Sequence, residues 1–229
     1  MLLLFDIDGT LVRGAAVEHA EALRAALHEV HHIDTRAAGV VDPAGRTDGE
    51  IARMILLECG VSAQRIDDRA EEVRGQCCRL YSTLCPDDLS HTVVPGIPEL
   101  LTWLSDEDDV TLGLLTGNYE GVARLKLGRT GIGSHFASAP GAFGSDAEDR
   151  TSLPHIARRR AGGPGGAYPR AGTIVIGDTP RDIACARADD VRCVAVTTGP
   201  HGADELAAAD AVATDAQDLR RVLVSLLNV

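Results

Sequence analysis

Short apolar segments that alternate with helix-like segments constrain the fold of this chain more than any other feature. Leu2–Phe5 contains no polar residue, and the later segments that end at Leu115 and Ile176 are almost as apolar. Strands of this kind are typical of a parallel sheet that is buried on both faces. The sequence predicts five strands, at Leu2–Phe5, Val110–Leu115, Phe136–Ser138, Thr173–Ile176 and Cys193–Thr197.

Helical periodicity fills the segments between these strands. Apolar residues recur three and four positions apart in the predicted helices Glu99–Leu104, Glu120–Leu127 and Ser152–Arg160, and a further helix begins at Arg181. Strands that alternate with helices favour an open parallel sheet covered on both faces. We therefore predict an α/β fold with a Rossmann-like sheet.

One long segment contains helical patterns only. Residues 15–88 hold predicted helices at Glu18–His31, Asp48–Cys59 and Ile66–Leu84, and no strand pattern interrupts them. This segment is expected to be an inserted all-helical domain. Residues 1–14 and 89–229 would then form the core around the sheet.

Three polar clusters stand where predicted strands end. Asp6 and Asp8 follow the first strand, Thr116-Gly117-Asn118 follows the second, and Asp178 with Asp182 follows a later one. The carboxyl ends of parallel strands meet at one edge, where ligands bind in such sheets. Carboxylates crowded there would need a cation, and oxygen ligands suit Mg²⁺. The order of the clusters favours a magnesium site.

These clusters resemble the motifs of the haloacid dehalogenase superfamily, in particular its phosphatases similar to phosphoglycolate phosphatase. Asp6–Val12 resembles the first motif, Leu114–Asn118 the second and Gly177–Asp182 the fourth. The resemblance implies that the helical insertion at 15–88 is a mobile cap over the sheet-containing core.

The resemblance also implies roles for the residues at the strand ends. Asp6 would attack phosphorus and form an aspartyl-phosphate, while Asp8 would protonate the leaving oxygen and later deprotonate the attacking water. The neighbouring carboxylate is expected to raise the pKa of Asp8 for this purpose. Thr116 and the amides near Gly117 would hold the phosphoryl group, and Asn118 would shape the loop or orient Asp6.

Metal ligands follow from the same resemblance. Mg²⁺ would be bound by the Asp6 carboxylate, the backbone carbonyl of Asp8 and Asp178. Asp182 would be either a ligand through water or a support for the other ligands.

The third motif departs from the family pattern. The family places a lysine before the fourth motif, but Lys126, the only lysine among 22 basic residues, lies too early in the chain. We expect Arg150 to take this position and clamp the phosphoryl oxygens as a permanent cation. Arg46, in the loop Gly45-Arg46-Thr47-Asp48, could contact the substrate from the cap.

Charge narrows the class of partner. With 34 acidic and 22 basic residues the formal net charge is −12, which argues against nucleic-acid and membrane-surface binding. The absence of a signal-like N-terminus or a long apolar segment predicts a cytoplasmic location. We expect a monomer or homodimer.

The leading prediction is a Mg²⁺-dependent phosphatase that acts on a small phosphorylated metabolite, a phosphomonoester similar to phosphoglycolate. A sugar phosphomutase of the same superfamily would use the same aspartates. The alternative from another class is a non-catalytic protein that binds a phosphorylated ligand or a protein partner, although such a protein would not need both Asp6 and Asp8.

Overall fold

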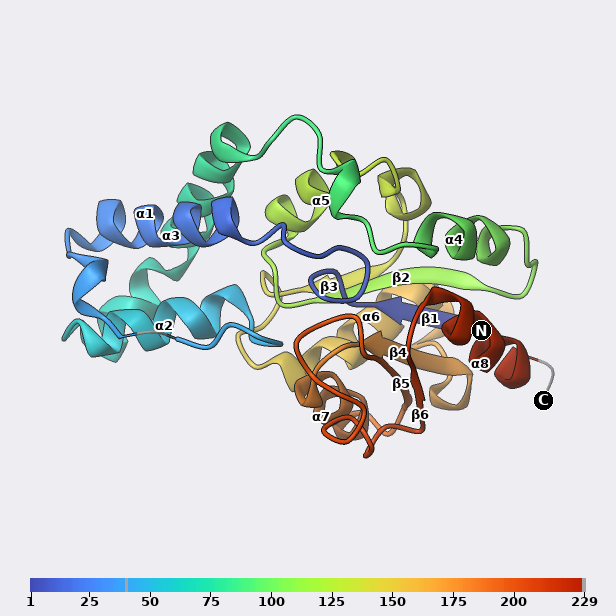
Figure 1. Ribbon diagram of the computed structural model, residues 1–229. Helices are drawn as coiled ribbons and strands as arrows, with labels where there is room; N and C mark the ends of the chain where they lie inside the picture. Colours follow the sequence, from blue (N-terminus) through green and yellow to red (C-terminus); the bar gives the residue numbers. More distant parts are fainter. Residues whose placement is uncertain (40, 228–229) are drawn as a thin grey trace.

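The computed structural model describes residues 1–39 and 41–227, and its centre is a six-stranded parallel sheet (Figure 1). The strand order is β3-β2-β1-β4-β5-β6, so β1 lies between β2 and β4. The strands are β1 (Leu2–Phe5), β2 (Thr111–Thr116), β3 (Gly141–Phe143), β4 (Thr173–Gly177), β5 (Arg192–Val196) and β6 (Ala211–Ala213). The predicted α/β class and open parallel sheet are confirmed.

Helices connect the strands and cover the sheet. They are α1 (Val17–His31), α2 (Asp48–Glu58), α3 (Ala63–Leu84), α4 (Ile97–Ser105), α5 (Glu120–Gly128), α6 (Leu153–Gly162), α7 (Pro180–Ala188) and α8 (Ala216–Leu227). Among the residues that the structure describes, no helix has the length and apolar character needed to cross a bilayer.

The central strand is buried on both faces. Successive side chains of a strand point to opposite sides. Leu3 and Phe5 therefore pack with the apolar residues of α4 and α8, whereas Leu2 and Leu4 pack with those of α6 and α7. This two-sided burial explains why the segment carries no polar residue.

Helices α1, α2 and α3 lie together beyond one end of the sheet (Figure 1). They share a core of their own, which includes Leu27 of α1, Ile55 of α2 and Tyr81 of α3. Tyr119 and Val122, at the start of α5, also belong to this core. The helical segment therefore packs onto α5 and is not an isolated unit.

Two parts of the sheet differ from the sequence predictions. Phe136 lies in a short 3-10 helix rather than a strand, because its ring is buried in an edge contact with Phe5 at 6.1 Å between centroids. The strand of this region, β3, begins only at Gly141 after the proline. The C-terminal elements β6 and α8 were not predicted. Strand β6 has only three residues, which are too few to form a recognisable strand pattern.

A buried ion pair joins α6 to the end of α7. Nε and Nη2 of Arg158 donate to the two carboxylate oxygens of Asp189 at 2.6 and 2.9 Å, and Arg170 adds a contact at 3.2 Å. Burial raises the pKa of Asp189, but the two arginines outweigh burial and leave that pKa below its usual value.

Replacing Asp189 tests this pair. Asp189→Asn leaves Arg158 buried without a counter-ion, so the free energy of unfolding in urea should fall by about 3 kcal/mol. Because the folded pKa is lowered, the wild-type advantage should be present above the unfolded pKa and vanish as pH falls through the folded one. Asp34→Asn, in the exposed pair with Arg36, is the matched control and should change little. Equal effects of both variants would contradict the assignment.

Candidate active site

The predicted polar clusters meet at one edge of the sheet. Phe5 aligns with Leu114 of β2 and Ile176 of β4, so the three strands end level. Asp6 continues the ladder, because its backbone N–H donates to the carbonyl of Ile176 at 2.9 Å. A cavity of about 720 Å³ opens at this edge, and the predicted site residues that line it are Asp6, Asp8, Arg46, Thr116, Gly117, Asn118, Arg150 and Asp178.

Three carboxylates form a buried cluster at this cavity, and two of them, Asp6 and Asp178, line it. Oxygens of Asp6, Asp178 and Asp182 all lie within 4.8 Å of one another. Burial, together with the charges of the neighbouring carboxylates, raises the pKa of Asp6 to about 7 and that of Asp178 to about 8. Thr10 donates a hydrogen bond to Asp178 at 3.1 Å. The cluster has the oxygen donors and the excess negative charge that suit a hard divalent cation.

Asp182 differs from the other two carboxylates. It is completely buried, and its oxygens are taken up by protein groups. One oxygen accepts from the amide and hydroxyl of Thr179 at 2.9 and 2.7 Å, and the other forms an ion pair with Arg150. Of the two alternatives left open for Asp182, these contacts favour support of the other ligands.

The structure brings Arg150 into the carboxylate cluster, as expected for the third motif. Its Nη2 lies 3.3 Å from Oδ1 of Asp6 and pairs with Asp182. Burial lowers the pKa of Arg150, but Asp182 and Asp6 outweigh it, and the pKa is raised overall. The buried Nε of Arg150 has no hydrogen-bond partner among the described residues.

Asp8 lies outside this cluster because a lysine holds it. Nζ of Lys126, which is completely buried, lies 2.8 and 2.7 Å from the two carboxylate oxygens of Asp8. Asn118 donates to Asp8 at 3.0 Å and accepts from Lys126 at 3.0 Å. Burial raises the pKa of Asp8, but Lys126 outweighs burial and lowers it overall. The expected rise in this pKa is wrong, and Asn118 contacts Asp8 rather than Asp6.

Sequence reasoning missed Lys126 as a site residue. Lys126 lies too early in the chain to match the family's usual lysine, and the cation beside Asp6 and Asp182 is Arg150. A signal was nevertheless present in α5, where Lys126 shares a helix face with the buried Val122 and Ala123. A charged residue on the apolar face of a helix needs a buried partner.

The loop that carries Arg46 closes over the second motif. A Cβ at Gly117 would lie 1.9 Å from the backbone oxygen of Arg46, so only glycine allows this approach. The amide of Asp48 donates to the carbonyl of Gly117 at 2.8 Å. Thr116 is buried beneath, and its hydroxyl accepts from the amide of Asn118 at 3.3 Å.

A second glycine is required where the first motif meets Asp178. Gly9 has a φ of +90°, and a Cβ there would lie 2.1 Å from Oδ2 of Asp178. The backbone of the first motif at Gly9 therefore packs directly against the carboxylate of Asp178 in the fourth motif.

Comparison with protein families agrees with this geometry. A family model described as haloacid dehalogenase-like hydrolase matches residues 3–187. The chain belongs to the haloacid dehalogenase-like hydrolases. The match spans all the strand-end clusters described above, and the resemblance stated from the sequence is confirmed.

Similar proteins of this family carry a common description. A phosphoglycolate phosphatase of Pseudomonas fluorescens is 28% identical over 204 residues, which cover 86% of this chain and 70% of that protein. A phosphoglycolate phosphatase of Rhodospirillum rubrum is 29% identical over 198 residues, with 86% and 79% covered.

Solved structures share the haloacid dehalogenase-like fold over nearly the whole chain. A β-phosphoglucomutase from Clostridium difficile has a TM-score of 0.67 at 21% identity and covers 99% of this chain and 96% of that one. A predicted phosphatase from Clostridium acetobutylicum also has a TM-score of 0.67, at 17% identity and 98% coverage of both chains. At these identities the likeness concerns the fold.

Removing the lysine should destabilise the protein. Lys126→Met leaves Asp8 without its counter-ion, and the free energy of unfolding in urea should fall by about 3 kcal/mol. Arg129→Met is the matched control, because its ion pair with Asp87 is exposed, and it should cost at most about 1 kcal/mol. Combining Lys126→Met with Asp8→Asn should recover part of the loss, since neither charge then remains. A double variant that loses the sum of both single effects would contradict the pairing.

Proposed function

We propose that this hydrolase is a Mg²⁺-dependent phosphatase that cleaves a phosphomonoester similar to phosphoglycolate through an aspartyl-phosphate. In this proposal residues 15–88 are the cap, and residues 1–14 with 89–229 are the catalytic core. The observation that carries the proposal is the surroundings of Asp6, a buried carboxylate at the cavity with a guanidinium on one side and a second carboxylate on the other. The acidic chain is expected to act in the cytoplasm as a monomer or homodimer.

The residues present fit a divalent cation. Asp6 and Asp178 both reach the cavity, both have raised pKa values, and Arg150 alone does not balance three carboxylates. We propose that Asp6, Asp178 and the backbone carbonyl of Asp8 hold the ion, with Asp182 behind them. When bound, Mg²⁺ would neutralise these carboxylates and the phosphoryl oxygens during transfer.

Asp6 would make the first bond. Its carboxylate oxygen attacks phosphorus, the bond from phosphorus to the ester oxygen breaks, and the alcohol leaves with a proton from Asp8. Arg150 would donate hydrogen bonds to the phosphoryl oxygens as their charge grows, while Thr116 and the amide near Gly117 would orient the group. Arg46, which belongs to the proposed cap, would lie beside the alcohol portion of the substrate.

Asp8 would complete the cycle. It takes a proton from water, whose oxygen attacks phosphorus and releases inorganic phosphate and the Asp6 carboxylate. The pairing with Lys126 supports this half of the cycle most directly, since it keeps Asp8 anionic and oriented. In the first half Asp8 must enter the step protonated, so that its proton passes to the leaving oxygen and the carboxylate that remains pairs with Lys126.

The names of the relatives support phosphatase chemistry over the alternatives. The two relatives described above are phosphoglycolate phosphatases, so phosphoglycolate is the first compound to assay. The phosphoglucomutase likeness concerns the fold and does not favour a mutase. A pure binding protein would have no use for both Asp6 and Asp8.

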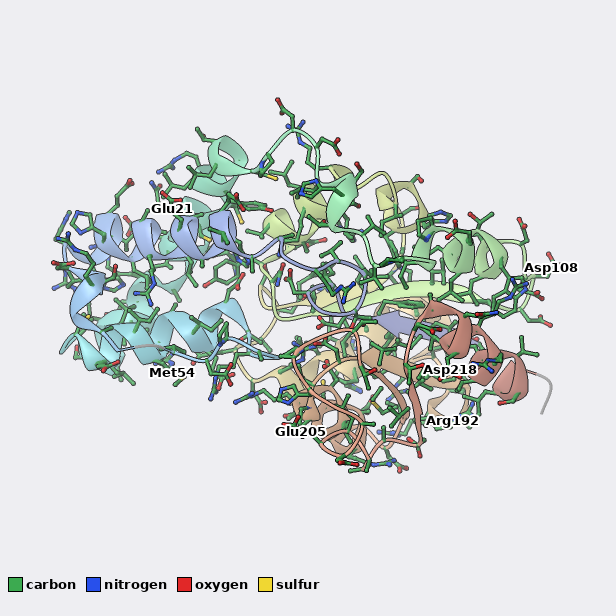
Figure 2. All side chains as sticks on the ribbon, viewed as in Figure 1. Glu21, Met54, Asp108, Arg192, Glu205 and Asp218 are labelled. Atoms are coloured by element: carbon green, nitrogen blue, oxygen red, sulfur yellow. The ribbon has the colours of Figure 1, made fainter. Side chains whose placement is uncertain are left out.

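Replacing the nucleophile tests the proposal. Asp6→Asn should reduce phosphate release from phosphoglycolate and from p-nitrophenyl phosphate by at least about 1000-fold, because an amide cannot form the phosphoenzyme. Circular dichroism should be unchanged. Asp108→Asn, on the loop before β2 at the opposite end of the sheet, is the matched control (Figure 2). Comparable rates for Asp6→Asn and the wild type would contradict the assignment of Asp6 as the nucleophile.

Metal removal gives an independent test. Treatment with a chelator should abolish phosphate release, and added Mg²⁺ should restore it, since the carboxylates then regain their counter-charge. Asp178→Asn should raise the Mg²⁺ concentration needed for half-maximal activity by at least about tenfold. Activity that survives chelation would contradict the proposed role of the ion.

A further inference from the structure

One wall of the active-site cavity is apolar. It consists of Ala20 and Leu23 on α1, Val41 on the following loop, and Ile51 and Ile55 on α2. We call these five residues the cap wall. Residues three or four positions apart share a helix face, so each helix presents its pair in one direction. None of these side chains can donate or accept a hydrogen bond.

The outer faces of the same helices carry both polar and apolar residues. Glu21 on α1 and Met54 on α2 are exposed, and Figure 2 shows them on opposite outer sides of the helical segment. Exposed apolar residues also occur elsewhere on these helices, at Val17, Met54 and Leu57, so the cap wall is distinguished by its place on the cavity.

Polar side chains of the cap that border the cavity already have protein partners. Arg24 donates to a backbone carbonyl at 3.0 Å, and Arg46 forms an ion pair with Glu50. His19 lies 3.0 Å from Asp48. Arg46 and His19 therefore have acidic partners, whereas Arg24 contacts a backbone carbonyl and is paired with no carboxylate among the described residues.

Arg13 is the one arginine of the core loop that borders the cavity without such a partner. It is exposed, and no side-chain partner is found for it among the described residues. A small substrate with two anionic groups, such as phosphoglycolate, would direct its carboxylate to Arg13 or Arg24. The cavity side of the more accessible wall residues Ala20, Val41 and Ile51 would then have no contact with the substrate.

We propose that the preferred substrate is a phosphomonoester whose alcohol has an apolar body, aliphatic or aromatic, that packs on the cap wall. This inference rests on the phosphatase activity proposed above, and it replaces the phosphoglycolate-like alcohol of that proposal with an apolar one. A cavity of about 720 Å³ lies in the range that buries ligands much larger than glycolate. An apolar alcohol would also remove both its own surface and the cap wall from water.

A sugar phosphate fits this wall poorly. Each buried hydroxyl needs a hydrogen-bond partner, and an unpaired one is costly. The cap wall offers none, so the hydroxyls of a hexose would lose their water without replacement. The same argument disfavours the mutase alternative.

The test compares chain lengths on the full-length protein. Phosphate release is measured with n-alkyl phosphates from methyl to octyl, with phosphoglycolate and with a hexose phosphate. In parallel, binding of the matching alkylphosphonates is measured by calorimetry. We expect kcat/KM and affinity to rise by about threefold to fourfold per methylene until the wall is covered.

A pair of variants on α2 locates the effect. Ile51→Gln should flatten the dependence on chain length, whereas Met54→Gln, an equivalent change on the outer face, should leave it intact. Ala20→Gln on α1 is a second wall variant at an exposed position, in case Ile51→Gln lowers stability. Thermal unfolding of each variant identifies those that fold.

The outcomes separate the two proposals. Affinity that does not rise with chain length, or a higher kcat/KM for phosphoglycolate or the hexose phosphate, overturns the apolar substrate class. Chain-dependent binding without phosphate release from any ester supports the cap wall and overturns the phosphatase proposal. Equal flattening by Ile51→Gln and Met54→Gln also overturns the role of the wall.

Discussion

A balance of buried charge at the carboxyl edge of the sheet underlies the rest of this structure. Four aspartates meet there, and two buried cations offset part of their charge. Arg150 pairs with Asp6 and Asp182, and Lys126 pairs with Asp8. Uncompensated charges at this depth would cost several kcal/mol each. The α5 helix and the turn before α6 must therefore dock where their cations can reach the carboxylates.

Much of this arrangement is predictable from local sequence. An apolar segment followed at once by Asp6 or Asp178 determines both the strand and the position of the acid at its end, because parallel strands share one polarity. The helical segment is equally predictable from the sequence, since three periodic helices follow one another there and no strand pattern interrupts them. Arg150 could be named only from the family pattern and the scarcity of lysine.

The remainder depends on contacts between distant segments. Lys126 and Asp8 are 118 positions apart, and nothing near either residue reports that they meet. Phe136 looks like part of a strand, but its ring fills space beside Phe5 and the strand forms five residues later, at Gly141. Burial in a core can come from either arrangement, so periodicity alone does not distinguish them.

The carboxylate of Asp48 links the two parts of the molecule through a helix end. Tyr119 supplies no side-chain cap for α5, and its amide donates instead to Asp48 at 2.6 Å, while His19 contacts the same oxygen. A helix N-terminus favours a negative charge. If the start of α2 moved away, the N-terminus of α5 would lose the carboxylate that caps it. The helix that carries Lys126 is therefore held in part by the helical segment, so the position of the lysine beside Asp8 depends on contacts from both parts of the chain.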